Sequence, residues 1–268
     1  MPSRRVFVAA LAAPTLTARA LAQKPSERSG ALRLGVDRAL QESGLADRLR
    51  HAFGADTGIA VLLVPGPALA VLDAVRDGET DAALVNAPAA ESALEQQGLV
   101  HDRRTVAVGE FVIVGPLPAA VRGRVPPPGH SAVDAFTRIH EQAAADPASV
   151  VFLSPGDGSG VHIVEQALWR AARIEPVAPW YASAEPGKSF CEQVRSRGAY
   201  ALVERGAWNA HVGRPLGIVV EGDPLLVESV HAMRSFRVSH PAGKIFVAWI
   251  AGGHGRAVVA RHAGYRSH

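Results

Sequence analysis

Several residue types are scarce in this chain, and each scarcity excludes a class of protein. Its 268 residues contain a single cysteine, Cys191, which excludes an internal disulfide, so an exported form has to rely on its core for stability. We expect Cys191 to be a small buried residue on a helix. Beyond the N-terminus there is no apolar run long enough to cross a bilayer, so we expect a soluble mature protein.

Lysine occurs three times, and the formal net charge of +3 depends on the N-terminal segment. That segment carries three arginines and no acidic residue, so its removal leaves a net charge of 3 − 3 = 0. The remaining chain has no clustered basic stretch of the kind that binds nucleic acid. The eleven histidines are scattered without metal-ligand spacing, so we expect neither a metal nor a cofactor.

The N-terminus has the pattern of an export signal. Two arginines at positions 4 and 5 precede an apolar stretch over residues 6–13, and small residues end at Ala22, where we expect cleavage. The sequence SRRVF resembles a twin-arginine signal, with Sec export as the competing interpretation. We therefore predict a periplasmic protein in which residues 23–30 form a disordered linker.

Strand-like and helix-like segments alternate along the rest of the chain. Apolar residues at alternate positions or in short buried runs indicate strands, and four-residue spacing indicates helices. Strands are expected at 32–36, 59–64, 82–85, 111–114, 150–153, 199–203 and 216–220, with helices at 43–53, 67–77, 89–97, 132–145, 160–173, 188–197, 204–210 and 244–251. This order predicts an α/β fold with mixed, mostly parallel sheets and helices on both faces. We expect the C-terminal residues from His254 onward to fray.

A stiff polar connection, RVPPPG at residues 124–129, indicates a crossing between two lobes. We assign residues 31–116 and 221–268 to lobe 1, and residues 117–220 to lobe 2. Ligands of such sheets bind beyond the carboxyl ends of strands. The loops at 35–44 and 154–162 satisfy this rule, and we expect them to face each other across an interlobe cleft.

The second of these loops reads SPGDGSGVH and joins a strand to a helix. Glycines and a helix start together can seat an anion. An ordinary corner whose serine caps the helix is the alternative. The spacing does not match the Walker, dinucleotide-binding or nucleophile-elbow motifs. Ser159 and His162 lie three residues apart, which leaves a secreted serine hydrolase as a third hypothesis; we expect no catalytic residues.

Several short words of the sequence, in the same order, resemble the periplasmic tungstate-binding proteins, the solute-capturing components of ABC importers for oxyanions. They include SGL at 43–45, DRR at 102–104, FVIVGP at 111–116, SPGDGSGVH at 154–162, ALW at 167–169, WY at 180–181, GAY at 198–200, ERG at 204–206 and VVEGDP at 219–224. The resemblance implies a two-lobe, type II periplasmic-binding-protein fold that closes by hinge motion. It also implies a non-enzymatic, monomeric protein that delivers a small anion to a membrane permease. A ligand sensor or accessory protein with an altered ligand is the alternative.

The resemblance implies a ligand site in the two facing loops. The family's first loop usually reads TTTS, where this chain has Val36-Asp37-Arg38-Ala39, and its second reads SRGDDSGTH, where this chain has Pro155 and Val161 in place of the arginine and threonine. We expect the ligand-binding residues to be Asp37, Arg38, Ala39, Ser154, Gly156, Ser159, Gly160 and Val161. Three interpretations are open: an oxyanion site rebuilt around Arg38, a changed ligand with both an anion and an amine, or solvated loop charges at Asp37 and Arg38.

Overall fold

The computed structural model describes residues 30–117, 127–211 and 216–268. The predicted export signal over residues 1–22 lies outside these ranges, as do most of the predicted linker over residues 23–30 and the proline-rich connection up to Pro126. No helix in the described ranges is long and apolar enough to span a membrane.

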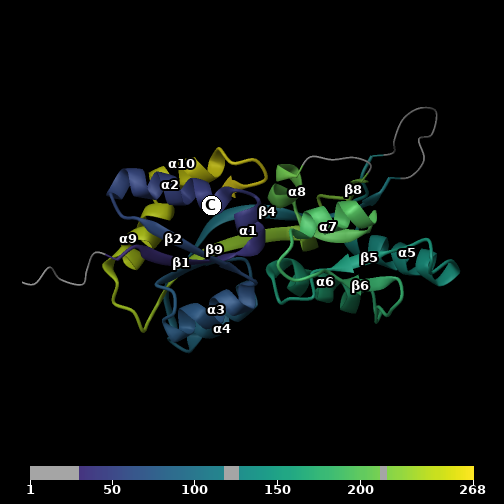
Figure 1. The fold of residues 1–268 in the computed structure, drawn as a ribbon, viewed down its shortest axis with the longest axis horizontal. Helices are drawn as coiled ribbons and strands as arrows, with labels where there is room; N and C mark the ends of the chain where they lie inside the picture. The colour runs from purple at the N-terminus through teal and green to yellow at the C-terminus, as the bar shows by residue number, and fades with distance from the viewer. Residues whose placement is uncertain (1–29, 118–126, 212–215) are drawn as a thin grey trace, which may run out of the picture. The chain divides into compact units, whose positions relative to one another are not determined.

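Helices and strands alternate along the described chain, as the sequence predicts (Figure 1). In chain order they are β1 (Leu32–Asp37), α1 (Arg38–Glu42), α2 (Leu45–Thr57), β2 (Val61–Gly66), α3 (Ala68–Asp77), β3 (Ala82–Val85), α4 (Pro88–Gln96), β4 (Val100–Pro116), α5 (Ala132–Ala145), β5 (Phe152–Ser154), α6 (Gly160–Ala171), β6 (Tyr181–Ser183), α7 (Phe190–Arg197), β7 (Ala201–Glu204), α8 (Arg205–Ala210), β8 (Leu216–Val220), a 3-10 turn (Pro224–Leu226), β9 (Val227–Ser235), α9 (Pro241–Ile250), α10 (Gly253–Ala260) and β10 (Arg266–Ser267).

The main sheet is mixed, with strand order β10-β4-β9-β3-β1-β2. Strand β1 pairs in parallel with β2 and β3, whereas β9 runs antiparallel to β3 and β4. Helices α2, α9 and α10 cover one face, and α3 and α4 cover the other (Figure 1). The α/β class with helices on both faces is therefore confirmed, and the carboxyl end of β1 leads directly into α1.

Strand β4 is much longer than the sequence predicts, and β9 is not predicted at all. The first part of β4 pairs with β9 and β10, and its last part pairs with β7 and β8. The polar run His101–Thr105 hides the first half of β4, since it lacks an apolar alternation. In β9, Glu228 and His231 are buried, so polar residues occupy positions where a sequence pattern shows apolar ones.

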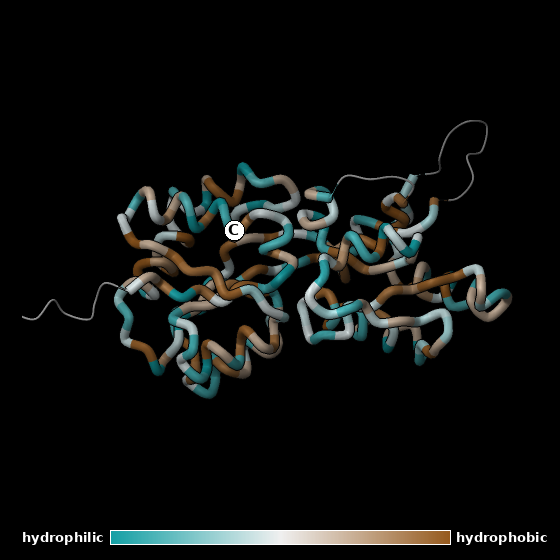
Figure 2. The backbone as a smooth tube through the Cα atoms, viewed as in Figure 1, coloured by the Kyte–Doolittle hydropathy of each residue, from teal (hydrophilic) through white to brown (hydrophobic). Residues whose placement is uncertain are grey.

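The buried apolar residues form four clusters that segregate along the chain. Two clusters draw on residues 32–107 and 230–259 together with Tyr265, and they lie on opposite faces of the main sheet. The other two draw on residues 111–226, and one of them contains the packed aromatic rings of Phe136, Phe152 and Trp169. Figure 2 shows hydrophobic stretches along the central strands, while the helices alternate in hydropathy.

The C-terminal residues are ordered, so the prediction that they fray is wrong. They form α10 and β10, and the side chains of His262 and Tyr265 are buried. The Tyr265 hydroxyl donates a hydrogen bond to Ser43 Oγ at 3.2 Å, and the His262 ring lies 2.9 Å from the Ser43 carbonyl oxygen. The tail is fixed by residues more than 200 positions away, which its own glycine- and arginine-rich sequence does not reveal.

Candidate functional site

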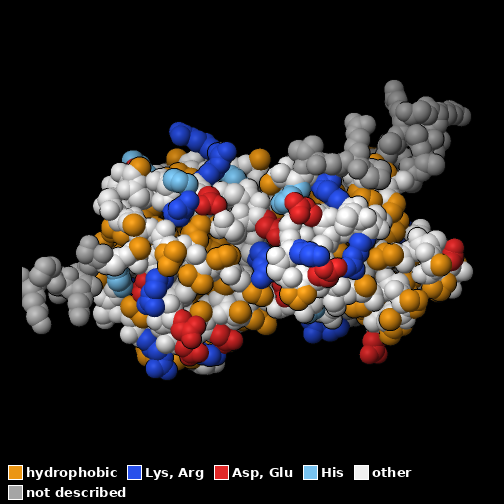
Figure 3. Space-filling model, in the orientation of Figure 1, with side chains coloured by type: hydrophobic (Ala, Val, Ile, Leu, Met, Phe, Trp, Pro, Cys, Tyr) orange, Lys and Arg blue, Asp and Glu red, His pale blue; other side chains and the backbone are white. Residues whose placement is uncertain are grey.

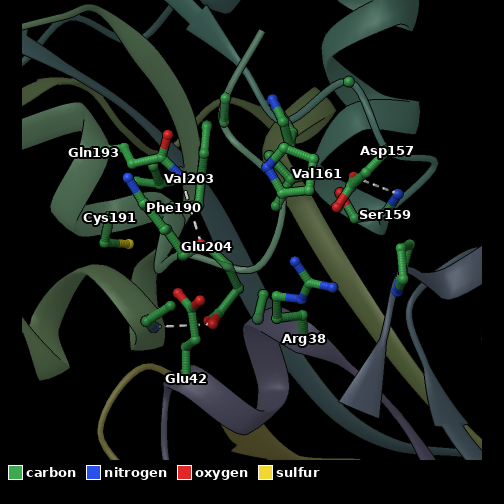
Figure 4. A pocket seen from close by; sticks show the side chains of 18 of the residues that line it. Arg38, Glu42, Asp157, Ser159, Val161, Phe190, Cys191, Gln193, Val203 and Glu204 are labelled. Atoms are coloured by element: carbon green, nitrogen blue, oxygen red, sulfur yellow. Dashed lines mark hydrogen bonds between the residues drawn. The ribbon is translucent and has the colours of Figure 1, made fainter. Parts of the chain in front are cut away.

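A pocket of about 390 Å³ opens where α1 meets the loop before α6. Its lining comes from α1, the loop at 155–159, the turn after β6, and the neighbouring parts of α7, β7 and α8. Figure 4 shows Glu42, Glu204 and Arg38 along one side, Phe190, Val203 and Cys191 on another, and Asp157, Ser159 and Val161 opposite. Ten of the twenty lining residues are apolar, so the pocket offers hydrocarbon walls as well as charges.

The glycine-rich corner at 154–162 is held by hydrogen bonds among its own residues. Ser159 caps α6, and its hydroxyl accepts a hydrogen bond from the His162 N–H at 3.3 Å. Gly156 and Gly158 both adopt positive φ angles, which glycine tolerates without a steric penalty. The Gly158 N–H donates to Nδ1 of His162 at 3.0 Å. The helix-capping interpretation of this corner is confirmed.

Ser159 and His162 do not form a catalytic pair in this arrangement. Among the described residues, the Ser159 hydroxyl hydrogen-bonds to the backbone N–H of His162 and not to its ring. Burial lowers the pKa of His162, which weakens it as a base. The geometry therefore favours a role for both residues in holding the shape of the corner over a role in hydrolysis.

Asp37 is fully buried, and its carboxylate lies where backbone N–H groups from separate segments converge. It caps α1 by accepting a hydrogen bond from the Ala39 N–H at 2.9 Å. It also accepts a longer hydrogen bond, at 3.5 Å, from the Gly160 N–H at the start of α6. Burial raises its pKa to about 6, and these hydrogen bonds limit the rise. One of the interpretations left open by the sequence makes Asp37 a solvated loop charge; instead it is buried and points inward onto backbone amides.

Two charged side chains of α1 project into the pocket, one from each end of the helix. Arg38 makes no hydrogen bond or ion pair with any of the described residues. Glu42 accepts a hydrogen bond from the Ser189 hydroxyl at 3.4 Å, and burial raises its pKa. Residues four apart lie on the same face of a helix, which is why both side chains reach the same cavity. Arg38 is therefore a cation held at the pocket wall and available to a ligand.

Buried carboxylates continue behind the pocket wall. The two oxygens of Glu204 accept hydrogen bonds from the Gly206 and Ala207 N–H groups, at 2.7 and 2.9 Å. Burial raises the pKa of Glu204 to about 7. Glu228 accepts a hydrogen bond from the Asn86 side-chain amide, and burial together with the Glu204 charge raises its pKa well above the usual range. The pKa of both acids is raised because burial shields them from water.

The residues predicted for the site divide into two sets. Arg38, Ala39, Gly156, Ser159 and Val161 line the pocket. Asp37, Ser154 and Gly160 lie behind it and are all buried.

Contacts fix the position of the second set. The Ser154 hydroxyl accepts a hydrogen bond from the Gly156 N–H at 3.2 Å. A Cβ added at Gly160 would lie 2.0 Å from Oδ1 of Asn86, so the backbone there is packed against the residue that follows β3.

Other pocket residues were not expected from the sequence. They include Glu42, Phe190, Gln193, Glu204 and Ala207. The four-residue spacing from Arg38 is a signal for Glu42, because it places both on one helix face. Cys191 is buried on α7, as predicted, and it also lines the pocket.

The fold and this pocket define a class, and comparisons with known proteins agree. A family model described as the PBP superfamily domain matches residues 24–228. The chain belongs to this superfamily, and within it to the family of periplasmic tungstate-binding proteins. The resemblance found in the sequence is thereby confirmed.

Individual relatives show how far the likeness extends. The tungstate-binding protein TupA of Peptoclostridium acidaminophilum is 30% identical over 236 residues, which cover 84% of this chain and 79% of the relative. A tungstate ABC transporter structure from Geobacter sulfurreducens has 25% identity and a TM-score of 0.67, and covers 86% of this chain and 97% of its own. The structure of the tungstate-binding protein TupA from Desulfovibrio alaskensis has 27% sequence identity and a TM-score of 0.65. The match covers 89% of this chain and 98% of that protein.

Proposed function

We propose that this protein is an extracytoplasmic solute-binding protein that captures a small anionic solute in this pocket and delivers it to an ABC permease. Arg38 carries the proposal, because it is a cation in the pocket wall that makes no hydrogen bond or ion pair within 4.0 Å with the described residues and interacts only at longer range with Glu42. Glycine-loop residues and apolar walls complete a concave site of the size that encloses small molecules. The relatives support the same role, since one is a tungstate-binding protein and another is described as a tungstate ABC transporter.

Capture would follow from closure of two lobes. We assign the clusters built on residues 32–107 and 230–265 to one lobe, and those built on residues 111–226 to the other. The pocket lies between them, since α1 belongs to the first and the corner before α6 to the second. A ligand touching both would favour the closed form through its additional contacts. We further propose export to the periplasm and a monomeric state.

Ligand binding is tested by thermal unfolding and titration calorimetry on the purified protein. The anions are tungstate, molybdate, sulfate and phosphate, together with small organic carboxylates. A bound solute at a hundredfold excess over its Kd stabilises the folded state by about 2.7 kcal/mol. If neither these anions nor small amino acids, whose carboxylate can also bind Arg38, stabilise the protein or give saturable heat, the proposed function is wrong.

Arg38→Gln provides the matched test of the site. Loss of one charge-assisted hydrogen bond costs about 1.5–3 kcal/mol, which corresponds to roughly a 10- to 150-fold weaker affinity. Arg138→Gln is the control, because Arg138 is exposed on α5 and does not line the pocket. Equal affinities in the two variants would contradict the role given to Arg38.

A further inference from the structure

The place where backbone amides converge is already occupied by the chain itself. The N–H groups of Ala39 in α1 and Gly160 in α6 both donate to the Asp37 carboxylate, at 2.9 and 3.5 Å. These are donors that could otherwise hold a bound anion. A free oxyanion would have to displace a covalently attached carboxylate from them, and a negative charge beside Asp37 would be repelled.

Close packing leaves no space for a second anion between the corner and the main sheet. The Gly160 backbone lies against Asn86, so that even one added methyl group would approach Oδ1 within 2.0 Å. The Leu69 N–H donates a hydrogen bond to the Gly158 carbonyl oxygen at 3.2 Å. The available volume lies instead in the neighbouring pocket, which α1 and the outer residues of this corner line together.

The charges of that pocket suit a solute that carries both signs. Arg38 and Glu42 lie one helical turn apart and are both half-buried in the pocket wall, yet they form no ion pair with each other within 4.0 Å. Glu42, Asp157 and Glu185 also outnumber the two basic side chains of the lining, Arg38 and Lys188. Glu204, whose pKa is raised to about 7, adds a further negative charge when it is ionised. A solute that is only anionic meets this excess of acid, whereas a solute with an ammonium group is attracted by it.

We infer that the solute is an amino-acid-type zwitterion with an apolar body, whose carboxylate binds Arg38 and whose ammonium group binds Glu42. The planar guanidinium of Arg38 matches the geometry of a carboxylate. Phe190, Val203 and Val161 provide the surface for the hydrocarbon part, which an inorganic oxyanion lacks (Figure 4). This inference rests on the proposed capture and delivery of a solute through Arg38, and it adds an ammonium group and an apolar body to the anionic group of that solute.

The test compares matched probes by calorimetry after a thermal-shift screen of the standard amino acids. Leucine is compared with 4-methylpentanoate, which lacks the ammonium group, and with 3-methylbutylamine, which lacks the carboxylate; valine and phenylalanine receive the same treatment. We expect at least one amino acid to bind saturably and both of its truncated analogues to bind at least about tenfold more weakly. Tungstate, molybdate, sulfate and phosphate should give no saturable heat at millimolar concentration.

Variants of Arg38 and Glu42 test the contacts at the two ends of the solute separately. Arg38→Gln and Glu42→Gln should each weaken the affinity for the amino acid by about 10- to 100-fold. Glu42→Gln should leave the affinity for the deaminated acid unchanged. Arg138→Gln serves as the control, and unfolding of the ligand-free variants shows that they fold. Saturable tungstate binding that depends on Arg38, with no amino acid bound, would overturn the inference but keep the proposed function. Equal binding of the amino and deaminated acids would also overturn it, and no binding of any tested anion or amino acid would remove both.

Discussion

Replacing Asp37 with asparagine should stabilise the protein at neutral pH. The pKa of Asp37 rises from 3.8 to about 6 because the carboxylate is fully buried. At about 1.4 kcal/mol for each tenfold change in the acid constant, this corresponds to about 3 kcal/mol of destabilisation when the group is ionised. Asparagine keeps an oxygen that can accept from the Ala39 N–H and removes the charge, so it mimics the protonated carboxyl group.

The direction in which stability changes with pH follows from proton binding by Asp37. A raised pKa means that folded Asp37 holds its proton at a pH where the unfolded chain has released it. Stability therefore falls as pH rises from 3.8 through about 6 and levels off above that range. The free energy of unfolding of Asp37→Asn, minus that of the wild type, should grow by about 2 kcal/mol between pH 4.5 and 8.

Urea unfolding at several pH values measures this difference directly, because titrations shared by both proteins cancel. Asp56→Asn is the control: Asp56 is near the surface, and its hydrogen bonds with Trp249 and His254 lower its pKa, so this variant should gain no stability as pH rises. A difference between Asp37→Asn and the wild type that stays constant with pH, or that shrinks as pH rises, would refute the burial argument.

Three other predictions follow from packing. Gly160→Ala should lower the free energy of unfolding by at least about 1–3 kcal/mol in urea, because the new methyl group collides with Asn86, whereas Gly253→Ala, with open space around it, should not; equal effects would contradict the close approach. Trp169→Ala should cost about 3–5 kcal/mol in the same assay, since the ring is buried in an aromatic cluster, and a loss below 1 kcal/mol would show that the cluster is not tightly packed. Cys191 should react slowly with a thiol reagent until urea unfolds the chain, because burial raises its pKa well above the usual range; rapid labelling of the native protein at pH 8 would contradict this.

Much of the fold follows from local patterns in the sequence. Alternating apolar residues predict the strand at 32–37, and apolar residues at four-residue spacing predict the helix at 160–171, which begins after the capping residue Ser159. Strand β9 and the C-terminal tail cannot be predicted in this way, because their buried polar residues form hydrogen bonds with partners distant in the sequence. His262, for example, lies against the carbonyl oxygen of Ser43.

The sequence by itself determined the α/β alternation, the capped glycine corner and the family, because each depends on residues close together in the chain. Only the tertiary structure decided what the candidate site contains. The Asp37 carboxylate meets the Gly160 amide across 123 positions, and the Arg38 and Glu42 side chains face a cavity that residues between Pro67 and Ala207 also line. Sequence spacing can place such groups on a loop or a helix face, but burial and contacts between distant segments decide whether a charge binds a solute or is satisfied by the chain.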